Sequence, residues 1–131
     1  MASCTEKHNT VGHSIGRMLL RHGLREFFGQ GLPQGLSLPF EELGLRQIAY
    51  RTENGGGYMA DGYARVSKRP GVMIAQNGPA ATLVVAPLAE ALKSSIPLVV
   101  MLQEIPLKNE DRNAFQEFDH VRLFSACSKW T

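Results

Sequence analysis

Short apolar runs alternate along this chain with segments in which apolar residues recur every three or four positions. The short runs predict strands at residues 24–28, 46–51, 72–75 and 96–102, and the recurring segments predict helices at residues 10–22, 37–43, 58–66, 80–93 and 114–124. The strand runs are apolar throughout rather than at every second position, which is typical of a parallel sheet covered on both faces. We therefore predict an α/β fold of three layers, with a mostly parallel β-sheet between helices.

The helix pattern makes further predictions that the structure can test. Thr10 should cap the first helix, whose single apolar face would consist of Val11, Ile15, Met18 and Leu19. Pro39 should interrupt the second helix, and Pro87 should kink or break the helix at residues 80–93. That helix is apolar on nearly every side, so we expect it to be largely buried.

Length and composition add only broad limits. The chain has 131 residues, 44% of them hydrophobic, and a net charge of +2 without clustered cations, which suits one globular domain and does not favour nucleic acid. The two cysteines form no disulfide framework, and no apolar run approaches the roughly 20 residues that cross a bilayer. We expect a soluble, cytoplasmic protein with a flexible leader at residues 1–9 and one domain at residues 10–131.

The segment from Arg51 to Arg65 reads RTENGGGYMADGYAR and combines a carboxylate with three glycines. We expect a loop there, in which Glu53 follows the second strand and Gly55, Gly56 and Gly57 let backbone or ligand approach closely. Ligands of open α/β sheets bind outside the carboxyl ends of the strands. Glu53 is therefore a candidate ligand contact, and the alternative is a solvated turn residue.

Metal and nucleophile chemistry find little support. The four histidines are dispersed without a ligand spacing, no serine lies in a Gly-x-Ser-x-Gly sequence, and Cys127 has no base nearby in the sequence. A dinucleotide site is a stronger alternative, because Gly29-x-Gly31-x-x-x-Gly35 follows a strand and Glu53 follows the next one. However, the third glycine is one position late, and Pro33 falls where the phosphate-binding helix should run.

Three segments in order carry a more specific resemblance: TENGGGYMADGYARVSKRPGV, QNGPAATLVVAPLAEALKSSIPLVV and DRNAFQEFD. They resemble the thiamine diphosphate-dependent enzymes related to acetolactate synthase, in their N-terminal, pyrimidine-binding domain. The resemblance runs from about Thr10 to the last residue. It implies thiamine diphosphate as cofactor and an activity that makes or breaks C–C bonds next to a carbonyl of 2-oxo acids.

The resemblance also implies roles for particular residues. Glu53 matches the catalytic glutamate, which hydrogen-bonds the aminopyrimidine ring of the cofactor and assists proton removal from the thiazolium carbon. The other residues that the resemblance places at the cofactor are Gln30, Pro33, Asn77, Gly78, Pro79 and Gln116. The alternatives are an ordinary turn at Gly78-Pro79 and a surface position for Gln116.

Two departures limit what the resemblance implies. Ala80 and Leu83 replace the Gly and Asn that acetolactate synthases commonly have after Gly-Pro, so the substrate stays open, as does FAD binding. The chain contains no Gly-Asp-Gly motif with a downstream Asn-Asn pair, which in the family holds Mg²⁺.

The chain also ends at residues 127–131 inside what we predict to be an extended element. We therefore expect a fragment that lacks the last helix and strand of the domain and is inactive alone. Its partner would be a diphosphate-binding domain, in the full-length or a partner chain, which would hold the Mg²⁺; the complete protein would be a homodimer or tetramer. Two other hypotheses stay open, an NAD(P)-binding oxidoreductase module and an inactive interaction fragment.

Overall fold

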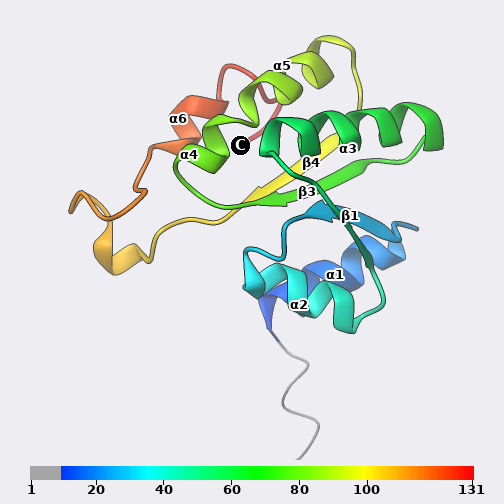
Figure 1. Ribbon diagram of the computed structural model, residues 1–131, viewed down its shortest axis with the longest axis horizontal. Helices are drawn as coiled ribbons and strands as arrows, with labels where there is room; N and C mark the ends of the chain where they lie inside the picture. The colour runs from blue at the N-terminus through cyan, green and yellow to red at the C-terminus, as the bar shows by residue number, and fades with distance from the viewer. Residues whose placement is uncertain (1–9) are drawn as a thin grey trace, which may run out of the picture.

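The computed structural model describes residues 10–131, so the predicted leader at residues 1–9 lies outside the described residues. A four-stranded sheet in the order β2-β1-β3-β4 lies between helices on both of its faces (Figure 1). Each pair of neighbouring strands in this sheet is parallel. The predicted α/β class and its three layers are confirmed.

Each predicted strand is present, with ends shifted by at most two residues. The strands are β1 (Glu26–Gly29), β2 (Arg46–Ala49), β3 (Gly71–Ala75) and β4 (Leu98–Leu102). The helices are α1 (Val11–Arg21), α2 (Gln34–Glu42), α3 (Glu53–Ser67), α4 (Pro79–Thr82), α5 (Val85–Lys93) and α6 (His120–Phe124), with a 3-10 turn η2 (Leu107–Asn109).

The core has one half on each face of the sheet. Because side chains alternate along a strand, Phe27 packs with α1 and α2, whereas its neighbour Phe28 packs on the opposite face with α3. Every residue of β3 is buried, as the continuous apolar run predicted. The edge strands β2 and β4 are only partly covered.

Helix α1 contacts α2 through glycines, and the predicted apolar face was wrong in part. Thr10 caps α1 as expected, with its side chain accepting the N–H of His13. However, Val11 and Met18 are 76% and 51% exposed, whereas Gly12 and Gly16 are buried. A Cβ atom on Gly12 would lie 2.2 Å from a backbone oxygen of α2. The close approach of the two helices at the glycines decides which side of α1 faces α2. A prediction from hydrophobic residues alone ignores glycine and therefore misplaces that side.

Helix α3 begins at Glu53, so the predicted loop at residues 53–57 was wrong. The Thr52 side chain caps the helix by accepting the N–H of Gly55 at 3.2 Å. Glycine in a helix is about 1 kcal/mol less favourable than alanine, but a Cβ on Gly56 would lie 2.4 Å from the Tyr50 ring and one on Gly57 would lie 2.3 Å from Pro87. Tertiary packing therefore overrides the low helix propensity of this segment.

The two prolines inside predicted helices behave differently. Pro39 does not interrupt α2: the helix continues through it, and Pro39 is buried where Gly12 lets α1 come close. Pro87 lies in the first turn of α5, and the helix is broken before it, at Leu83 and Val84, because proline has no N–H for the carbonyl of Leu83 and its ring clashes with that group. The Leu83 carbonyl instead accepts from the Asn54 side chain at 3.5 Å.

The expected burial of residues 80–93 was also wrong in part. Leu83 is 47% exposed, and Pro87 and Ala91 are the buried residues of α5. The other residues of α5 are only partly covered or exposed in the part of the chain that the structure describes.

The helix predicted at residues 114–124 is reduced to α6. Asp111, Asn113 and Gln116 have positive φ angles, which are incompatible with a continuous helix. The Glu117 carboxylate accepts the backbone N–H groups of Asp111 and Ala114 at 2.6 and 2.7 Å, so it organises a turn. Residues 127–131 form no strand. Within residues 10–131, no helix is both long and apolar enough to span a membrane.

Two glycines of α3 provide a direct test of this packing. In Gly57→Ala the new methyl group meets Pro87, so we expect the free energy of unfolding to fall by about 1–3 kcal/mol. Gly62 lies in the same helix, and a Cβ added there would have no atom within 4 Å, so Gly62→Ala should raise it by about 1 kcal/mol. Urea denaturation of both variants checks this, and equal effects at the two positions would contradict close packing at Gly57.

Candidate functional site

The predicted site residues gather at the carboxyl edge of the sheet. Gln30 directly follows β1, and Asn77 follows β3 by two residues. Glu53 comes four residues after the end of β2 and opens α3. Because parallel strands end at the same edge, the topology brings these three segments to one side of the molecule (Figure 1).

The loop after β1 is tied to the segment that leads into Glu53. The exposed Gln30 side chain donates to the backbone oxygen of Arg51 at 3.1 Å and to that of Tyr50 at 3.4 Å. The Gly31 N–H donates to the Gln47 side chain at 2.9 Å. Pro33 is buried at the N-cap of α2, without a side-chain capping bond. The loop is therefore held in place by hydrogen bonds to β2 and to the segment that follows it.

Glu53 is a half-buried carboxylate at the first position of α3. Within residues 10–131 its side chain makes no hydrogen bond or ion pair, so its acceptor positions face no protein donor. A negative charge is favoured at the N-terminus of a helix, where the macrodipole is positive. The geometry thus supplies a carboxyl group that is open to a ligand.

The Tyr50 side chain packs against the first turn of α3, which begins with Glu53. Its hydroxyl donates to the buried carbonyl of Ile74 at 2.9 Å, and its ring packs against Gly56. Burial raises the pKa of the Tyr50 phenol above its ordinary value, and the nearby Glu53 carboxylate raises it further. Tyr50 therefore stays protonated and serves as a hydrogen-bond donor within the core.

Asn77, Gly78 and Gln116 form a second group at the same edge. The Asn77 side chain donates to the backbone oxygen of Gln116 at 3.2 Å. Gly78 has φ 61° and ψ −127°, and a Cβ there would lie 2.7 Å from the Cβ of Gln116. Only glycine fits this conformation and contact. Pro79 begins α4 and is exposed.

The described residues show no hydrogen bond directly between this second group and Glu53. The two groups are joined through the framework, because Asn54 bonds the Leu83 carbonyl and Tyr50 bonds that of Ile74. The site residues predicted from the sequence therefore lie at one edge of the sheet, in two groups: one around Gln30 and Glu53, the other around Asn77, Gly78 and Gln116. Because the two groups share this edge, we infer that a ligand would bind between them.

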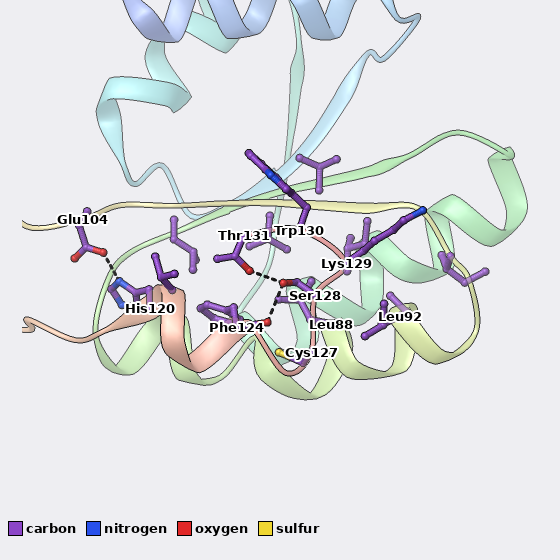
Figure 2. Close-up of a pocket in the computed structure, with 17 residues that line it drawn as sticks. Leu88, Leu92, Glu104, His120, Phe124, Cys127, Ser128, Lys129, Trp130 and Thr131 are labelled. Atoms are coloured by element: carbon purple, nitrogen blue, oxygen red, sulfur yellow. Dashed lines mark hydrogen bonds and ion pairs between the residues drawn. The ribbon is translucent and has the colours of Figure 1, made fainter.

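His120 is a site residue that the sequence reasoning missed. It is 6% exposed, its Nε2 accepts the N–H of Gly78 at 3.0 Å, and its Nδ1 lies 2.5 Å from a carboxylate oxygen of Glu104 (Figure 2). In the sequence it was one of four dispersed histidines. Gly78 lies 42 positions away along the chain, so no local pattern signals the contact.

A cavity of about 460 Å³ lies beside β4, between α5 and the segment that follows α6 (Figure 2). Its walls are mostly apolar and include Leu88, Leu92, Phe124 and Trp130. None of the site residues predicted from the sequence lines it. In residues 10–131 no group of three or more His, Cys, Asp or Glu side chains is placed to hold a metal ion.

Comparison with known families gives a match over most of the chain. The family described as "Thiamine pyrophosphate enzyme, N-terminal TPP binding domain" matches residues 9–123. This span includes both groups of site residues and His120.

Curated relatives agree with this match. The chain is 38% identical to the mitochondrial acetolactate synthase catalytic subunit of Aspergillus candidus over an alignment of 126 residues, and the match covers 92% of this chain and 18% of the relative. It is 36% identical to the chloroplastic acetolactate synthase of Arabidopsis thaliana over 116 residues, 85% of this chain and 17% of that protein. It is 38% identical to the acetolactate synthase of Mycobacterium bovis over 115 residues, 84% of this chain and 18% of the relative. The chain thus spans less than a fifth of the length of the relatives that it matches.

The raised pKa of Tyr50 predicts how stability depends on pH. Above about pH 10 the unfolded chain loses the tyrosine proton while the folded state keeps it, so the contribution of Tyr50 is present below that pH and declines above it. At neutral pH, Tyr50→Phe should lower the free energy of unfolding by about 0.5–1.5 kcal/mol, because the bond to Ile74 is lost. Denaturation at several pH values from about 8 to about 11 should show this difference shrinking; a constant difference would contradict the assignment.

Proposed function

The chain belongs to the thiamine pyrophosphate enzyme family, as an N-terminal TPP binding domain homologous to acetolactate synthases, and on this premise we propose that Glu53 is its catalytic carboxylate. The observation that carries the proposal is the open acceptor at Glu53, half-buried at the carboxyl edge of the sheet. Family membership disfavours the dinucleotide hypothesis and the inactive-fragment hypothesis.

The residues at this edge fit the aminopyrimidine part of the cofactor. An aminopyrimidine presents hydrogen-bond donors and acceptors around a flat ring, and a carboxylate without a protein partner complements its donor side. Gly78 is buried, and Gln116 packs where a side chain on Gly78 would lie, so the Gly78–Pro79 loop and Gln116 form one close-packed group at this edge. The loop at Gln30 and Pro33 lies at the same edge, held by the Arg51 backbone.

The roles proposed for these residues are those that the family resemblance implies. Thiamine diphosphate, when bound, supplies the electron sink for making and breaking C–C bonds next to a carbonyl. Glu53 would share one proton with a ring nitrogen of the aminopyrimidine: its protonated carboxyl group donates to that nitrogen, and its carboxylate accepts from the protonated ring. Asn77, Gly78 and Pro79 form the wall beside the ring, and Gln116 is the polar group assigned to the reacting carbon.

The proposal for the whole protein reaches further. Its activity would be acetolactate synthase-like, acting on a 2-oxo acid, and Ala80 and Leu83 are the positions that would alter the substrate. A diphosphate-binding domain outside these 131 residues would hold Mg²⁺, and the protein would work as a dimer or tetramer. The cytoplasmic location stays a prediction, since the fungal and plant relatives named above are mitochondrial and chloroplastic.

Cofactor binding separates this proposal from the dinucleotide hypothesis. The intact protein that carries this chain should bind thiamine diphosphate in the presence of Mg²⁺, and Glu53→Ala should weaken that binding because a contact is lost. NAD and NADP should show no saturable binding in the same calorimetric titrations. Binding of either dinucleotide that depends on Glu53 would overturn the proposal.

Substitution of Glu53 tests its chemical role. Glu53→Gln keeps the shape but cannot take up or release a proton, so exchange of the C2 proton of bound thiamine diphosphate should slow by about 10²–10⁴-fold. Cofactor affinity should change much less, because the diphosphate and Mg²⁺ supply most of the attachment. The exchange is measured by NMR after quenching.

A matched control for this substitution lies on α2. Glu41 is exposed and distant in the fold from the carboxyl edge, near the end of α2, so Glu41→Gln should exchange the C2 proton at the wild-type rate. An unchanged rate in Glu53→Gln would remove Glu53 from the mechanism.

A further inference from the structure

We propose that His120 is a positioning residue: oriented by Glu104, it accepts the N–H of Gly78 and so fixes the backbone of the Gly78–Pro79 loop. The functional consequence rests on the proposed function, in which this loop forms the wall beside the aminopyrimidine ring. The contact itself is a property of the fold and can be tested without cofactor.

The hydrogen bonds permit one arrangement of the imidazole proton. A backbone N–H can only donate, so Nε2 of His120, 3.0 Å from the nitrogen of Gly78, must be the acceptor. An ionised carboxylate can only accept, so Nδ1, 2.5 Å from Glu104, must carry the proton. Glu104 thus selects the neutral tautomer that leaves Nε2 free for Gly78, as the partner of one ring nitrogen sets the state of the other.

Gly78 needs such a partner because its N–H is buried and its conformation is unusual. Its φ of 61° and ψ of −127° lie outside the regions that other residues adopt readily. Its carbonyl accepts the N–H of Thr82 at 3.2 Å, within the first turn of α4. His120 binds the other polar group of this residue, so the orientation of Gly78 is fixed from both sides.

The ring of His120 is itself held firmly. It stacks on Phe124 with centroids 6.5 Å apart and planes 27° apart, and Phe118 lies 5.9 Å away. Asp119 caps α6, of which His120 is the first residue, by accepting the N–H of Arg122. Figure 2 shows the His120 side chain turned toward Glu104, which follows β4. The contact therefore joins the segments after β3 and β4 to the start of α6.

Hydrogen–deuterium exchange of the cofactor-free intact protein tests the contact first. His120→Leu removes the acceptor at similar volume, and we expect the amide of Gly78 to exchange about 10–100-fold faster, as for a buried donor left without its partner. His120→Gln supplies an amide oxygen that can accept the same N–H and should restore most of the protection. Glu104→Gln, whose amide can donate as well as accept, should give an intermediate rate.

The cofactor measurements then test the positioning role. In His120→Leu, affinity for thiamine diphosphate and exchange of its C2 proton should each fall about tenfold, and His120→Gln should recover both. His13→Leu is the matched control, because His13 is 3% exposed and lies 3.0 Å from the Glu42 carboxylate, but at the contact of α1 with α2. It should lower stability and leave the Gly78 amide and cofactor affinity unchanged.

Each result decides between outcomes. Unchanged exchange at Gly78 in His120→Leu, or a His120→Gln variant as impaired as His120→Leu, overturns the contact. Faster amide exchange with wild-type affinity and C2 exchange overturns the positioning role alone. If wild-type protein binds no thiamine diphosphate, the proposed function fails together with the positioning role, while the amide data still decide the contact. If His120→Leu does not fold, the exchange rates of the Gly78 amide in His120→Gln and Glu104→Gln decide whether the contact exists. Near-wild-type protection in His120→Gln with an intermediate rate in Glu104→Gln supports the contact, and a wild-type rate in both variants overturns the orienting role of Glu104.

Discussion

The close approach of α3 to Tyr50 and Pro87 is the constraint on which the carboxyl edge of the sheet depends. Without side chains at Gly56 and Gly57, the first turns of the helix lie directly on the Tyr50 ring and on the first turn of α5. Because this close packing holds residues 55–57 in helical conformation, α3 begins at Glu53, which occupies its first position. The carboxylate is therefore placed by packing of the glycines behind it rather than by contacts of its own.

The sequence was informative where apolar runs were long and unbroken. β3 was predicted to within one residue because residues 72–75 form an unbroken apolar run, and every residue of the strand is buried. The parallel direction of the strands followed from their alternation with helices. The site residues could be placed at one edge because parallel strands end together. The resemblance to a known family, in turn, assigned roles that no spacing in this chain could assign.

The sequence was uninformative where contacts between distant segments decided local structure. The glycines at residues 55–57 resemble a loop until Tyr50 and Pro87 are placed against them. The turn before α6 depends on the Glu117 carboxylate, which accepts the backbone N–H groups of Asp111 and Ala114. His120 meets Gly78 only after β3, β4 and α6 have come together. Each failure has the same physical origin, which is tertiary packing that overrides local propensity.

The break between α4 and α5 has a consequence for how this protein can diverge from its relatives. The four residues of α4 form a short unit of their own, in which Ala81 is buried, and Leu83, which directly follows it, is half exposed. The buried residues Pro87 and Ala91 belong to α5. The chain departs from the usual acetolactate synthase sequence at Ala80, which lies in this unit, and at Leu83, which directly follows it. Substitutions at these two positions would therefore change the surface beside the proposed site, while Ala81, Pro87 and Ala91 keep both short helices anchored in the core.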